Sequence, residues 1–479
     1  MPQNSVAGII GASSIKFGTS GARGLVSDFS SDVSAAFAIA FVEALKTQNI
    51  NVERIALGID RRPSSPDLAA SIAGGLQAIG CHVDYYGILP TPALALQSLS
   101  EKIPAIMVTG SHIPFDRNGI KFYRPTGEIT KLDESLIVSQ QALLPAFNPF
   151  LPSESDVAQT TYIQRYVAPF PKNALQGLRV GVYEHSSAGR AISKSILNAL
   201  GADVVSLGKT DVFVPIDTEA VSEEDQLQAK IWAKEHNLDA IFSTDGDGDR
   251  PLISDEHGNW LKGDVVGMLC AKYIAADALS VPVSCNSAIE TYTQIPVTRT
   301  KIGSPYVIEA MANQVSSFKV VAGFEANGGF LCASPFTLNG VPFKELPTRD
   351  AVLPLITLLN CTQEKGVTLS QLVDKLPPRF TASDRIQNLP SDLSESLIEV
   401  WSFNLETFLE TFHLQQSVLN VCTRDGLRVS LDNGQIVHLR PSGNAPELRC
   451  YCESYTQSDA NLLLSSMLQK LLTCFNSSN

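Results

Sequence analysis

The sequence feature that most constrains the fold is an alternation of short apolar strands with helices, which runs through most of the chain. Apolar residues recur at helical spacing over 32–49 and 66–80, and strand-like runs occupy 54–60, 81–87 and 105–109. Alternation on this length scale is typical of βαβ units, in which neighbouring strands of one sheet run parallel. The first part of the chain therefore predicts an α/β domain with a largely parallel sheet.

The same alternation restarts twice further along the chain. A second round has strands over 178–183 and 239–244, separated by helices, and a third round runs over 281–322. The chain has 479 residues, which is too many for a single hydrophobic core. We therefore expect three consecutive α/β domains with mixed, mostly parallel sheets.

The last part of the chain follows a different pattern. Strand-like stretches flank an Asp425-Gly426 turn, and helical spacing returns over 459–474. These signals predict a C-terminal α+β domain with an antiparallel sheet. Together with the three rounds of alternation, they indicate four domains around a central cleft. The expected domains span 1–155, 156–278, 279–377 and 378–479.

Charge and cysteine content exclude several classes of protein. The 36 Lys and Arg residues are outnumbered by 49 Asp and Glu, a formal charge of −13, whereas a nucleic-acid binder needs clustered basic residues. The nine cysteines form no CxxC pair, which favours reduced thiols, and Cys450 and Cys452 share one face of a strand-like run, which predicts a core position. We find no run of about 18 apolar residues that could span a membrane and no charged leader at the start of the chain. We therefore expect a cytoplasmic protein without nucleic-acid or membrane partners.

Three of the apolar strands end in loops of small and polar residues. One strand leads into 110–112, the next into 245–250, and the third into 324–329. In open α/β sheets, ligands bind beyond the carboxyl ends of the strands. We expect these strand ends, one per domain, to share a single cleft, which the loop 439–446 of the last domain could complete.

The second of these loops has the most specific chemistry. Asp245, Asp247 and Asp249 lie at alternate positions spaced by glycines, so their carboxylates can converge on one hard cation such as Mg²⁺. An EF-hand would use Glu256 as its twelfth residue, but Arg250 stands where that loop needs glycine, and a strand precedes it in place of a helix. An acidic surface turn is the structural alternative. Three protein carboxylates leave open positions on Mg²⁺, which suit phosphate oxygens.

The first loop offers a nucleophile. Ser111 stands directly after a strand, and Gly110 before it permits close approach of the backbone. A serine in this position could carry a phosphate or act in acyl transfer. The acyl-transfer elbow needs a helix after the serine, and Pro114 and the turn signal Asn118-Gly119 argue against one. Lys121 follows the expected turn and could return its ammonium toward the same loop.

Two further loops carry groups that bind polar ligands. One supplies the Arg440 guanidinium, the Ser442 hydroxyl and backbone N–H groups freed by Gly443, which together can form an anion cradle. A polar hairpin loop is the alternative there. The other offers the Glu325 carboxylate and the Asn327 amide, which can hydrogen-bond two vicinal sugar hydroxyls, although taken alone these two residues fit an ordinary turn better.

In their order along the chain, these loops resemble those of the α-D-phosphohexomutase superfamily. The stretch 17–24 is similar to the family's FGTDGxRG pattern, with Arg23 at its arginine, and 58–65 resembles a further family stretch. The serine loop is similar to TASHNP, and 299–303 resembles the loop that carries a substrate-facing lysine, here Lys301. The resemblance covers nearly the whole chain.

Three departures from the family pattern bear on the choice of substrate. Gly110 and Ile113 replace the usual Ala and Asn beside the serine, and Asn444-Ala445 replaces the usual Thr-Glu of the anion loop. Asn327 stands where mannose and glucose mutases usually have serine; it can replace that hydrogen-bonding group but is longer. The serine and the three aspartates on which the chemistry depends are all present.

The resemblance implies a reaction that interconverts hexose 6-phosphate and hexose 1-phosphate through a hexose 1,6-bisphosphate, with a phosphorylated serine in the resting enzyme. Sugar hydroxyls would bind Glu325 and Asn327. The implied Mg²⁺ ligands are phosphorylated Ser111, Asp245, Asp247 and Asp249. The implied catalytic residues near Ser111 are His112, Arg23, Lys121, Lys301 and Arg250, the last of which would orient the serine loop. The non-reacting phosphate would be held by Arg440, Ser442, Gly443, Asn444 and Arg449.

For the substrate, the first expectation is a phosphomannomutase, with phosphoglucomutase activity as well. Phosphoglucosamine mutase is the alternative, because the run 118–122 is similar to a stretch of those enzymes. A sugar-phosphate phosphatase and a non-catalytic sugar-phosphate sensor are alternatives of other classes, and the intact serine and aspartates argue against the sensor. A hexose phosphate is the expected partner, and both a monomer and a homodimer stay open.

Overall fold

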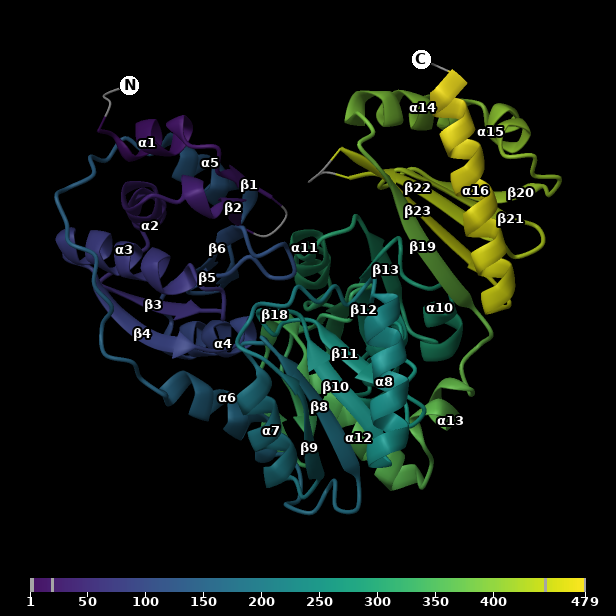
Figure 1. Ribbon diagram of the computed structural model, residues 1–479, viewed down its shortest axis with the longest axis horizontal. Coiled ribbons are helices and arrows are strands. Elements are labelled where there is room, and N and C mark those ends of the chain that lie inside the picture. Colours follow the sequence, from purple (N-terminus) through teal and green to yellow (C-terminus); the bar gives the residue numbers. More distant parts are fainter. Residues whose placement is uncertain (1–3, 19–20, 443–445, 478–479) are drawn as a thin grey trace.

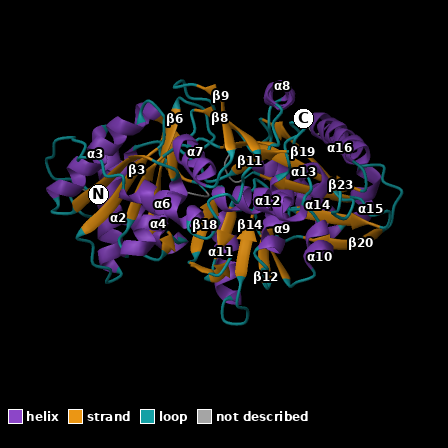
Figure 2. Ribbon diagram, turned by 90° about the horizontal axis from the view of Figure 1, so that it is seen from below, coloured by secondary structure: helices purple, strands orange, loops and turns teal. Residues whose placement is uncertain are grey.

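The computed structural model describes residues 4–18, 21–442 and 446–477. Its four larger sheets follow one another around an arc, with the N-terminal region at one end and the C-terminal region at the other (Figure 1). Helices cover the sheets, as the view turned by 90° also shows (Figure 2). The expected fold class is confirmed, because three mixed α/β sheets are followed by an antiparallel one.

The first sheet has the strand order β1-β2-β6-β5-β3-β4, and β7 pairs with β6. Strands β5, β3 and β4 run parallel, and the remaining strands are antiparallel to their neighbours. The strands are β1 (Lys16–Phe17), β2 (Ala22–Leu25), β3 (Arg54–Ile59), β4 (His82–Ile88), β5 (Ala105–Val108), β6 (Arg117–Arg124) and β7 (Gly127–Glu128). The helices of this region are α1 (Val6–Ala12), α2 (Ser31–Thr47), α3 (Ser65–Ala78), α4 (Thr91–Glu101), α5 (Lys131–Ser139) and the 3₁₀ helix η1 (Val26–Asp28).

One expectation about this region is wrong. Asn118 and Gly119 were expected to form a turn, but both lie inside β6. The Asn118 side chain donates to Ser64 and Ser65, and a Cβ on Gly119 would lie 2.8 Å from backbone oxygens on both sides. At this position the asparagine side chain bonds to a neighbouring segment, and the glycine leaves room for close approach of the adjacent backbone. The absence of a helix after Ser111 is confirmed, because the next regular element is β6.

The second and third sheets repeat the three-strand parallel arrangement. Parallel neighbours are β10-β8-β9 in the second sheet and β13-β12-β14 in the third, and antiparallel strands extend each sheet at one edge. The second region contains β8 (Arg179–His185), β9 (Asp203–Lys209), β10 (Ala240–Thr244), β11 (Pro251–Ser254), α6 (Val157–Val167), α7 (Arg190–Ala199), α8 (Glu223–His236) and α9 (Gly263–Tyr273). The third contains β12 (Ala278–Pro282), β13 (Val297–Thr300), β14 (Val321–Phe324), β15 (Phe330–Cys332), β18 (Leu346–Asp350), the hairpin β16 (Phe336–Leu338) and β17 (Val341–Phe343), α10 (Ala288–Thr293), α11 (Ser304–Gln314), α12 (Val352–Lys365) and α13 (Leu369–Val373).

The last strand of the third round, which the sequence pattern predicts over 318–322, begins later, at Val321. The N–H of Val320 donates to the Asp277 side chain at 2.9 Å and is therefore not available to the sheet ladder. The shift moves Phe324 into the strand, so Glu325 is the first residue beyond its carboxyl end.

The C-terminal sheet is antiparallel throughout, in the order β19-β23-β22-β21-β20. Residues alternate between its two faces along β23: Leu448, Cys450 and Cys452 pack into a core with the helices, and Arg449 and Tyr451 face the other way. The expected core position of the two cysteines is confirmed. The elements are β19 (Phe380–Gln387), β20 (Val418–Cys422), β21 (Leu427–Leu431), β22 (Ile436–Pro441), β23 (Glu447–Ser454), α14 (Ser391–Phe403), α15 (Leu405–Thr411) and α16 (Gln457–Ser477).

The hydrophobic cores show which regions of the chain pack against one another. One hydrophobic cluster runs from Leu94 in α4 through Val180 and Leu279 to Leu355 in α12 and so joins the first three regions, whereas the C-terminal region has a core of its own. All nine cysteines lie in the described part of the chain and form no disulfide there. Among the described helices, none is both long and apolar enough to cross a membrane.

Candidate active site

Ser111 lies just beyond the end of β5, in a backbone conformation that residues other than glycine rarely adopt. Its φ angle is +55°, in the left-handed region, and the residue is fully buried. The Ser111 N–H donates to Thr109 Oγ1 at 2.8 Å, and the Ser111 hydroxyl donates to Asp245 Oδ2 at 2.7 Å. The serine loop of the first region therefore meets the aspartate loop of the second directly.

The Arg62 guanidinium holds the serine loop in place. It donates four hydrogen bonds to backbone carbonyls of the loop, at distances of 2.5–3.0 Å. The acceptors are the carbonyl oxygens of Ser111, Ile113, Pro114 and Arg117. The sequence analysis missed this residue; its signal was the charged pair Arg61-Arg62 just beyond the end of β3, in a stretch already noted for its resemblance to the family.

The three aspartates of the loop between β10 and β11 converge as expected. All three are fully buried, and one carboxylate oxygen of each lies within 4.8 Å of the others. Within the described part of the chain, Asp247 Oδ1 and Asp249 Oδ1 are buried without a hydrogen-bond donor. Three clustered carboxylates, two of which have an oxygen without a hydrogen-bond donor, fit a hard divalent cation such as Mg²⁺. Glu256 accepts from Ser370, which excludes the EF-hand arrangement.

Cationic and hydroxyl groups surround these carboxylates. Lys121 Nζ donates to Asp247 Oδ2 at 2.5 Å and to Asp249 Oδ2 at 2.9 Å, and Thr91 Oγ1 donates to Asp247 Oδ2 at 2.5 Å. Burial opposes ionisation, but the Lys121 ammonium holds the pKa of Asp247 far below its usual range. Burial and the neighbouring Asp247 and Asp249 raise the pKa of Asp245 well above its usual range. The negative charge of Asp245 is thus disfavoured beside the other two carboxylates, and a bound cation would offset that repulsion.

His112, beside the serine, is a neutral imidazole. Arg250 Nη1 lies 3.0 Å from His112 Nδ1 and must donate to it, so this nitrogen carries no proton. Burial and the Arg250 charge lower the pKa of His112 to about 2. Arg23, on β2, has its pKa lowered to about 10 by burial and by Arg250, so it remains a cation at neutral pH. Arg250 contacts the serine loop through His112, and its orienting role stays a prediction.

The sugar loop joins β14 to β15 and brings both expected side chains into the interior. Glu325 is 4 % exposed and Asn327 is 7 % exposed. Asn327 Oδ1 accepts the N–H of Gly329 at 3.0 Å, so its amide N–H₂ is the group left to face a ligand. Arg349, a further residue that the sequence analysis missed, donates both to Glu325 and to Asp249.

The anion loop is supported by two arginines on neighbouring strands. Arg440 on β22 and Arg449 on β23 are register partners, so their side chains lie side by side on one face of the sheet. Asp425 Oδ2 lies 3.0 Å from Arg440 Nε, and Glu447 accepts from Arg449 at 2.9 Å. Two adjacent guanidinium groups suit a doubly charged anion. Ser442 beside them is buried, whereas Gly443 and Asn444 lie outside the described residues.

Lys301 is exposed, and its Nζ lies 5.9 Å from the centre of the Tyr306 ring. The next residue, Ile302, donates its N–H to Asp425 Oδ2 at 2.8 Å, so the Lys301 loop adjoins the anion loop. The structure thus brings Ser111, the aspartates and their nearby cations together at one place, with the sugar loop joined to them. The Lys301 loop and the paired arginines Arg440 and Arg449 adjoin Asp425 and its neighbours at a second place.

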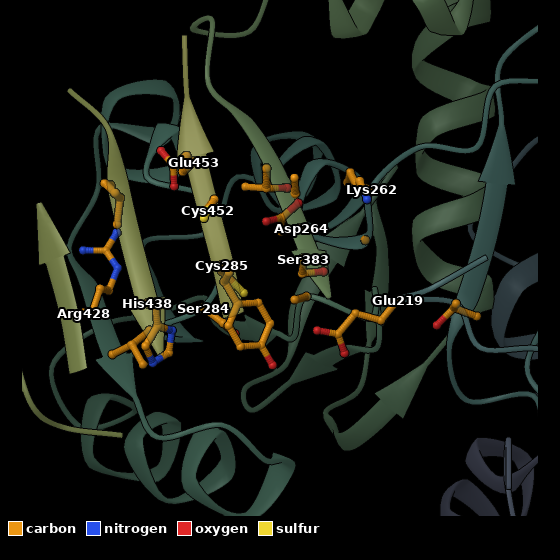
Figure 3. Close-up of a pocket in the computed structure, with 18 residues that line it drawn as sticks. Glu219, Lys262, Asp264, Ser284, Cys285, Ser383, Arg428, His438, Cys452 and Glu453 are labelled. Carbon is orange, nitrogen blue, oxygen red and sulfur yellow. The ribbon is translucent and has the colours of Figure 1, made fainter. Parts of the chain in front are cut away.

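A pocket lies where the second, third and C-terminal regions meet (Figure 3). His438 and Arg428 line it from the C-terminal sheet, and Glu219 and Asp264 line it from the opposite side. The carboxylates of Glu219, Asp264 and Glu453 make this pocket unfavourable for a phosphate. Ala326 of the sugar loop also lines it, so the pocket adjoins that loop.

Comparison with known proteins gives one consistent result. Families described as phosphoglucomutase/phosphomannomutase match consecutive stretches of the chain: alpha/beta/alpha domain I at residues 14–142, domain II at 160–258, domain III at 262–380 and the C-terminal domain at 384–470. A phosphomannomutase from Salmonella muenchen is 52% identical over 97% of this chain and 97% of its own length. A phosphomannomutase from Sinorhizobium fredii is 42% identical over 95% of this chain and 98% of its own length.

More distant relatives agree with this result. A phosphoglucosamine mutase from Desulforamulus reducens is 25% identical over 95% of this chain and 98% of its own length. The crystal structure of a phosphoglucomutase/phosphomannomutase family protein from Burkholderia thailandensis is 19% identical, with a TM-score of 0.74 over 95% of this chain and 96% of that chain. That likeness supports the fold.

Proposed function

Because this chain belongs to the phosphoglucomutase/phosphomannomutase family, we propose that it is a phosphomannomutase, an isomerase that interconverts mannose 6-phosphate and mannose 1-phosphate. The similar proteins at 52% and 42% identity are both phosphomannomutases, whereas the phosphoglucosamine mutase is only 25% identical. The observation that carries the chemistry is the 2.7 Å hydrogen bond from the Ser111 hydroxyl to Asp245, because it puts a nucleophilic oxygen at the edge of a cation site.

In the proposed reaction, phosphorylated Ser111 donates its phosphoryl group to the free hydroxyl of a hexose monophosphate. The bond between phosphorus and Ser111 Oγ breaks, a bond from phosphorus to the sugar oxygen forms, and the proton of the sugar hydroxyl ends on the freed Ser111 Oγ. The resulting hexose 1,6-bisphosphate turns around in the site, and its other phosphoryl group returns to Ser111. Mg²⁺ bound by Asp245, Asp247 and Asp249 would neutralise charge on the transferring group.

Lys121 and Arg23 support this transfer as cations. Lys121 makes ion pairs with Asp247 and Asp249, which raise its pKa although burial opposes the shift, so it keeps its proton in this state. Arg23 is cationic at neutral pH. Both positive charges stabilise the negative charge that spreads over the transferring phosphoryl group. His112 accepts a hydrogen bond from Arg250 and so keeps that guanidinium turned toward the serine loop.

The second phosphate of the substrate would bind the paired arginines. Arg440 and Arg449, with Ser442 beside them, form a site of generic anion donors. We include Gly443 and Asn444 in this proposed site from the sequence pattern. The site must accept the phosphate on either end of the sugar, because the substrate binds in both orientations. Glu325 and the Asn327 amide would hold sugar hydroxyls between the two phosphate positions.

The test is turnover of mannose 1-phosphate, glucose 1-phosphate and glucosamine 1-phosphate, followed by phosphorus NMR with Mg²⁺ and a trace of hexose 1,6-bisphosphate. We expect the mannose compound to be converted to its 6-phosphate, and conversion of the glucose compound would add phosphoglucomutase activity. Conversion of the glucosamine compound alone would replace the proposal by phosphoglucosamine mutase. Release of inorganic phosphate at the rate of isomerisation would indicate a phosphatase.

A further inference from the structure

Arg349 occupies a position that the proposed reaction leaves without a role. It lies near the end of β18, is 3 % exposed, and is followed by Asp350, which accepts hydrogen bonds from the hydroxyls of Tyr162 and Tyr166. These tyrosines come from α6, so the strand end is clamped by the second region. These hydrogen bonds hold the backbone at Asp350, and so at the neighbouring Arg349, independently of the contacts that the Arg349 side chain makes.

The Arg349 guanidinium spans two loops. Its Nε and Nη2 donate to Asp249 Oδ2 at 3.1 and 2.9 Å, in the aspartate loop. Its Nη1 donates to Glu325 Oε2 at 3.3 Å, in the sugar loop. The same nitrogen also donates to Ser304 Oγ at 3.0 Å. One planar group thus holds a candidate metal ligand and a candidate sugar ligand at a fixed separation.

The sugar loop packs closely against the Arg349 side chain. A Cβ on Gly329 would lie 2.5 Å from Arg349 Cδ and 2.7 Å from its Cγ, so the arginine stem lies directly against the loop backbone. The loop backbone at Gly329 therefore blocks movement of the Arg349 stem toward it. Within the described residues, the other carboxylate oxygen of Asp249, Oδ1, has no hydrogen-bond donor, and Arg250 Nε lies 3.7 Å from it.

We propose that Arg349 is a positioning residue that ties the aspartate loop to the sugar loop and sets the charge felt by a cation at the aspartates. In the mutase reaction it would hold Glu325 at a constant distance from the metal position, and this part rests on the proposed function. Its charge would also repel a divalent cation held by Asp249, so it would limit how tightly the metal binds. This second part depends only on the aspartates.

The charge part is tested without substrate, by titrating the purified protein with Mn²⁺ and following free Mn²⁺ by electron paramagnetic resonance. Arg349→Gln removes the charge, and we expect Mn²⁺ to bind about tenfold tighter or more. Arg349→Lys keeps the charge, and we expect binding within about threefold of wild type. Arg124→Gln is the matched control, because Arg124 pairs with the buried Asp133 away from the site, at 2.7 Å. Unchanged or weaker Mn²⁺ binding in Arg349→Gln would overturn the charge part.

The positioning part is tested by a double-mutant cycle of Arg349→Lys with Glu325→Gln. A lysine ammonium cannot span both carboxylates as the guanidinium does, so we expect kcat/KM to fall about tenfold or more in Arg349→Lys. If Arg349 acts through Glu325, the same substitution costs about twofold or less when Glu325 is already Gln. Equal losses in both backgrounds would overturn it. Failure of mannose 1-phosphate as substrate would leave the Mn²⁺ result intact and so be distinguished from failure of this inference.

Discussion

The Ser111 hydroxyl and the Asp245 carboxylate lie 2.7 Å apart although 134 positions separate them in the sequence. The contact joins the end of β5 in the first sheet to the end of β10 in the second. Ser111 is held there from its own side by Arg62, and Asp245 accepts backbone N–H groups of Asp249 and Arg250 at 3.2 Å. The proposed nucleophile and the candidate cation site therefore come from two separate sheets, and each can be tested separately.

The aspartate loop should lose its cation when one carboxylate is neutralised. In Asp247→Asn, we expect Mn²⁺ affinity to weaken about tenfold or more, because a charged ligand is lost while Lys121 and Arg349 remain as unbalanced cations. Titration with Mn²⁺ measures this directly. Asp255→Asn is the control, since Asp255 is a buried carboxylate of the same region that bonds to its own turn. Wild-type affinity in Asp247→Asn would remove this residue from the metal site.

The serine loop should not tolerate a methyl group beside the serine. A Cβ on Gly110 would lie 2.6 Å from Arg62 Cζ, and that guanidinium cannot retreat without losing its four carbonyl partners. We expect Gly110→Ala to lower kcat about tenfold or more with a smaller change in KM, because Ser111 is displaced from the reacting position. Steady-state kinetics measure the change. Gly11→Ala is the control, since a Cβ there meets nothing within 4 Å. A wild-type kcat in Gly110→Ala would contradict the packing role of this glycine.

The paired arginines of the C-terminal sheet should act mainly in binding. Arg440→Gln is expected to raise KM for the sugar phosphate by about tenfold or more while kcat changes less, since a contact to the non-reacting phosphate is made in both the ground state and the transition state. Arg54→Gln should leave KM unchanged, because Arg54 lies on β3 of the first sheet and pairs there with Asp84 and Glu101. A fall in kcat at constant KM in Arg440→Gln would instead assign this arginine to the chemical step.

Acid should destabilise the C-terminal region through His438. Burial lowers the pKa of His438 from 6.5 to about 4. The folded pKa lies below the unfolded one, so the stabilisation is fully present above about pH 6.5 and is lost as the pH falls toward 4. At pH 5 the loss is about 2 kcal/mol. Thermal unfolding at pH 7 and pH 5 should show a smaller acid shift in His438→Gln than in wild type or in His257→Gln, where the histidine is exposed. Equal acid shifts in all three proteins would contradict the burial effect.

The fold was predictable where the signal is local. Hydrophobic periodicity indicated the alternation of strands and helices, and contiguous loops such as 245–250 indicated the cation site. Asn118-Gly119 misled the prediction, because the same residue pair serves a turn or a closely packed strand, and only the neighbouring strands decide between them. The domain boundaries near 155, 278 and 377 and the individual roles of the site residues stay predictions.

The two residues that the sequence analysis missed act through tertiary contacts. Arg62 reaches Ser111 over 49 positions, and Arg349 reaches Asp249 over 100. An arginine near a strand end has no local pattern that distinguishes a loop-holding role from an exposed charge. Their roles follow only from the folded arrangement of the sheets, which brings distant strand ends to one place.

The most direct test of the central claim is to find where the phosphoryl group resides on the protein. Wild type and Ser111→Ala are incubated with radioactively labelled hexose 1,6-bisphosphate and Mg²⁺, and their peptides are mapped by mass spectrometry. We expect the label on the Ser111 peptide of wild type, no label on the variant, and loss of nearly all turnover of mannose 1-phosphate in the variant. Label on another residue, or substantial turnover by Ser111→Ala, would contradict the phosphoserine mechanism.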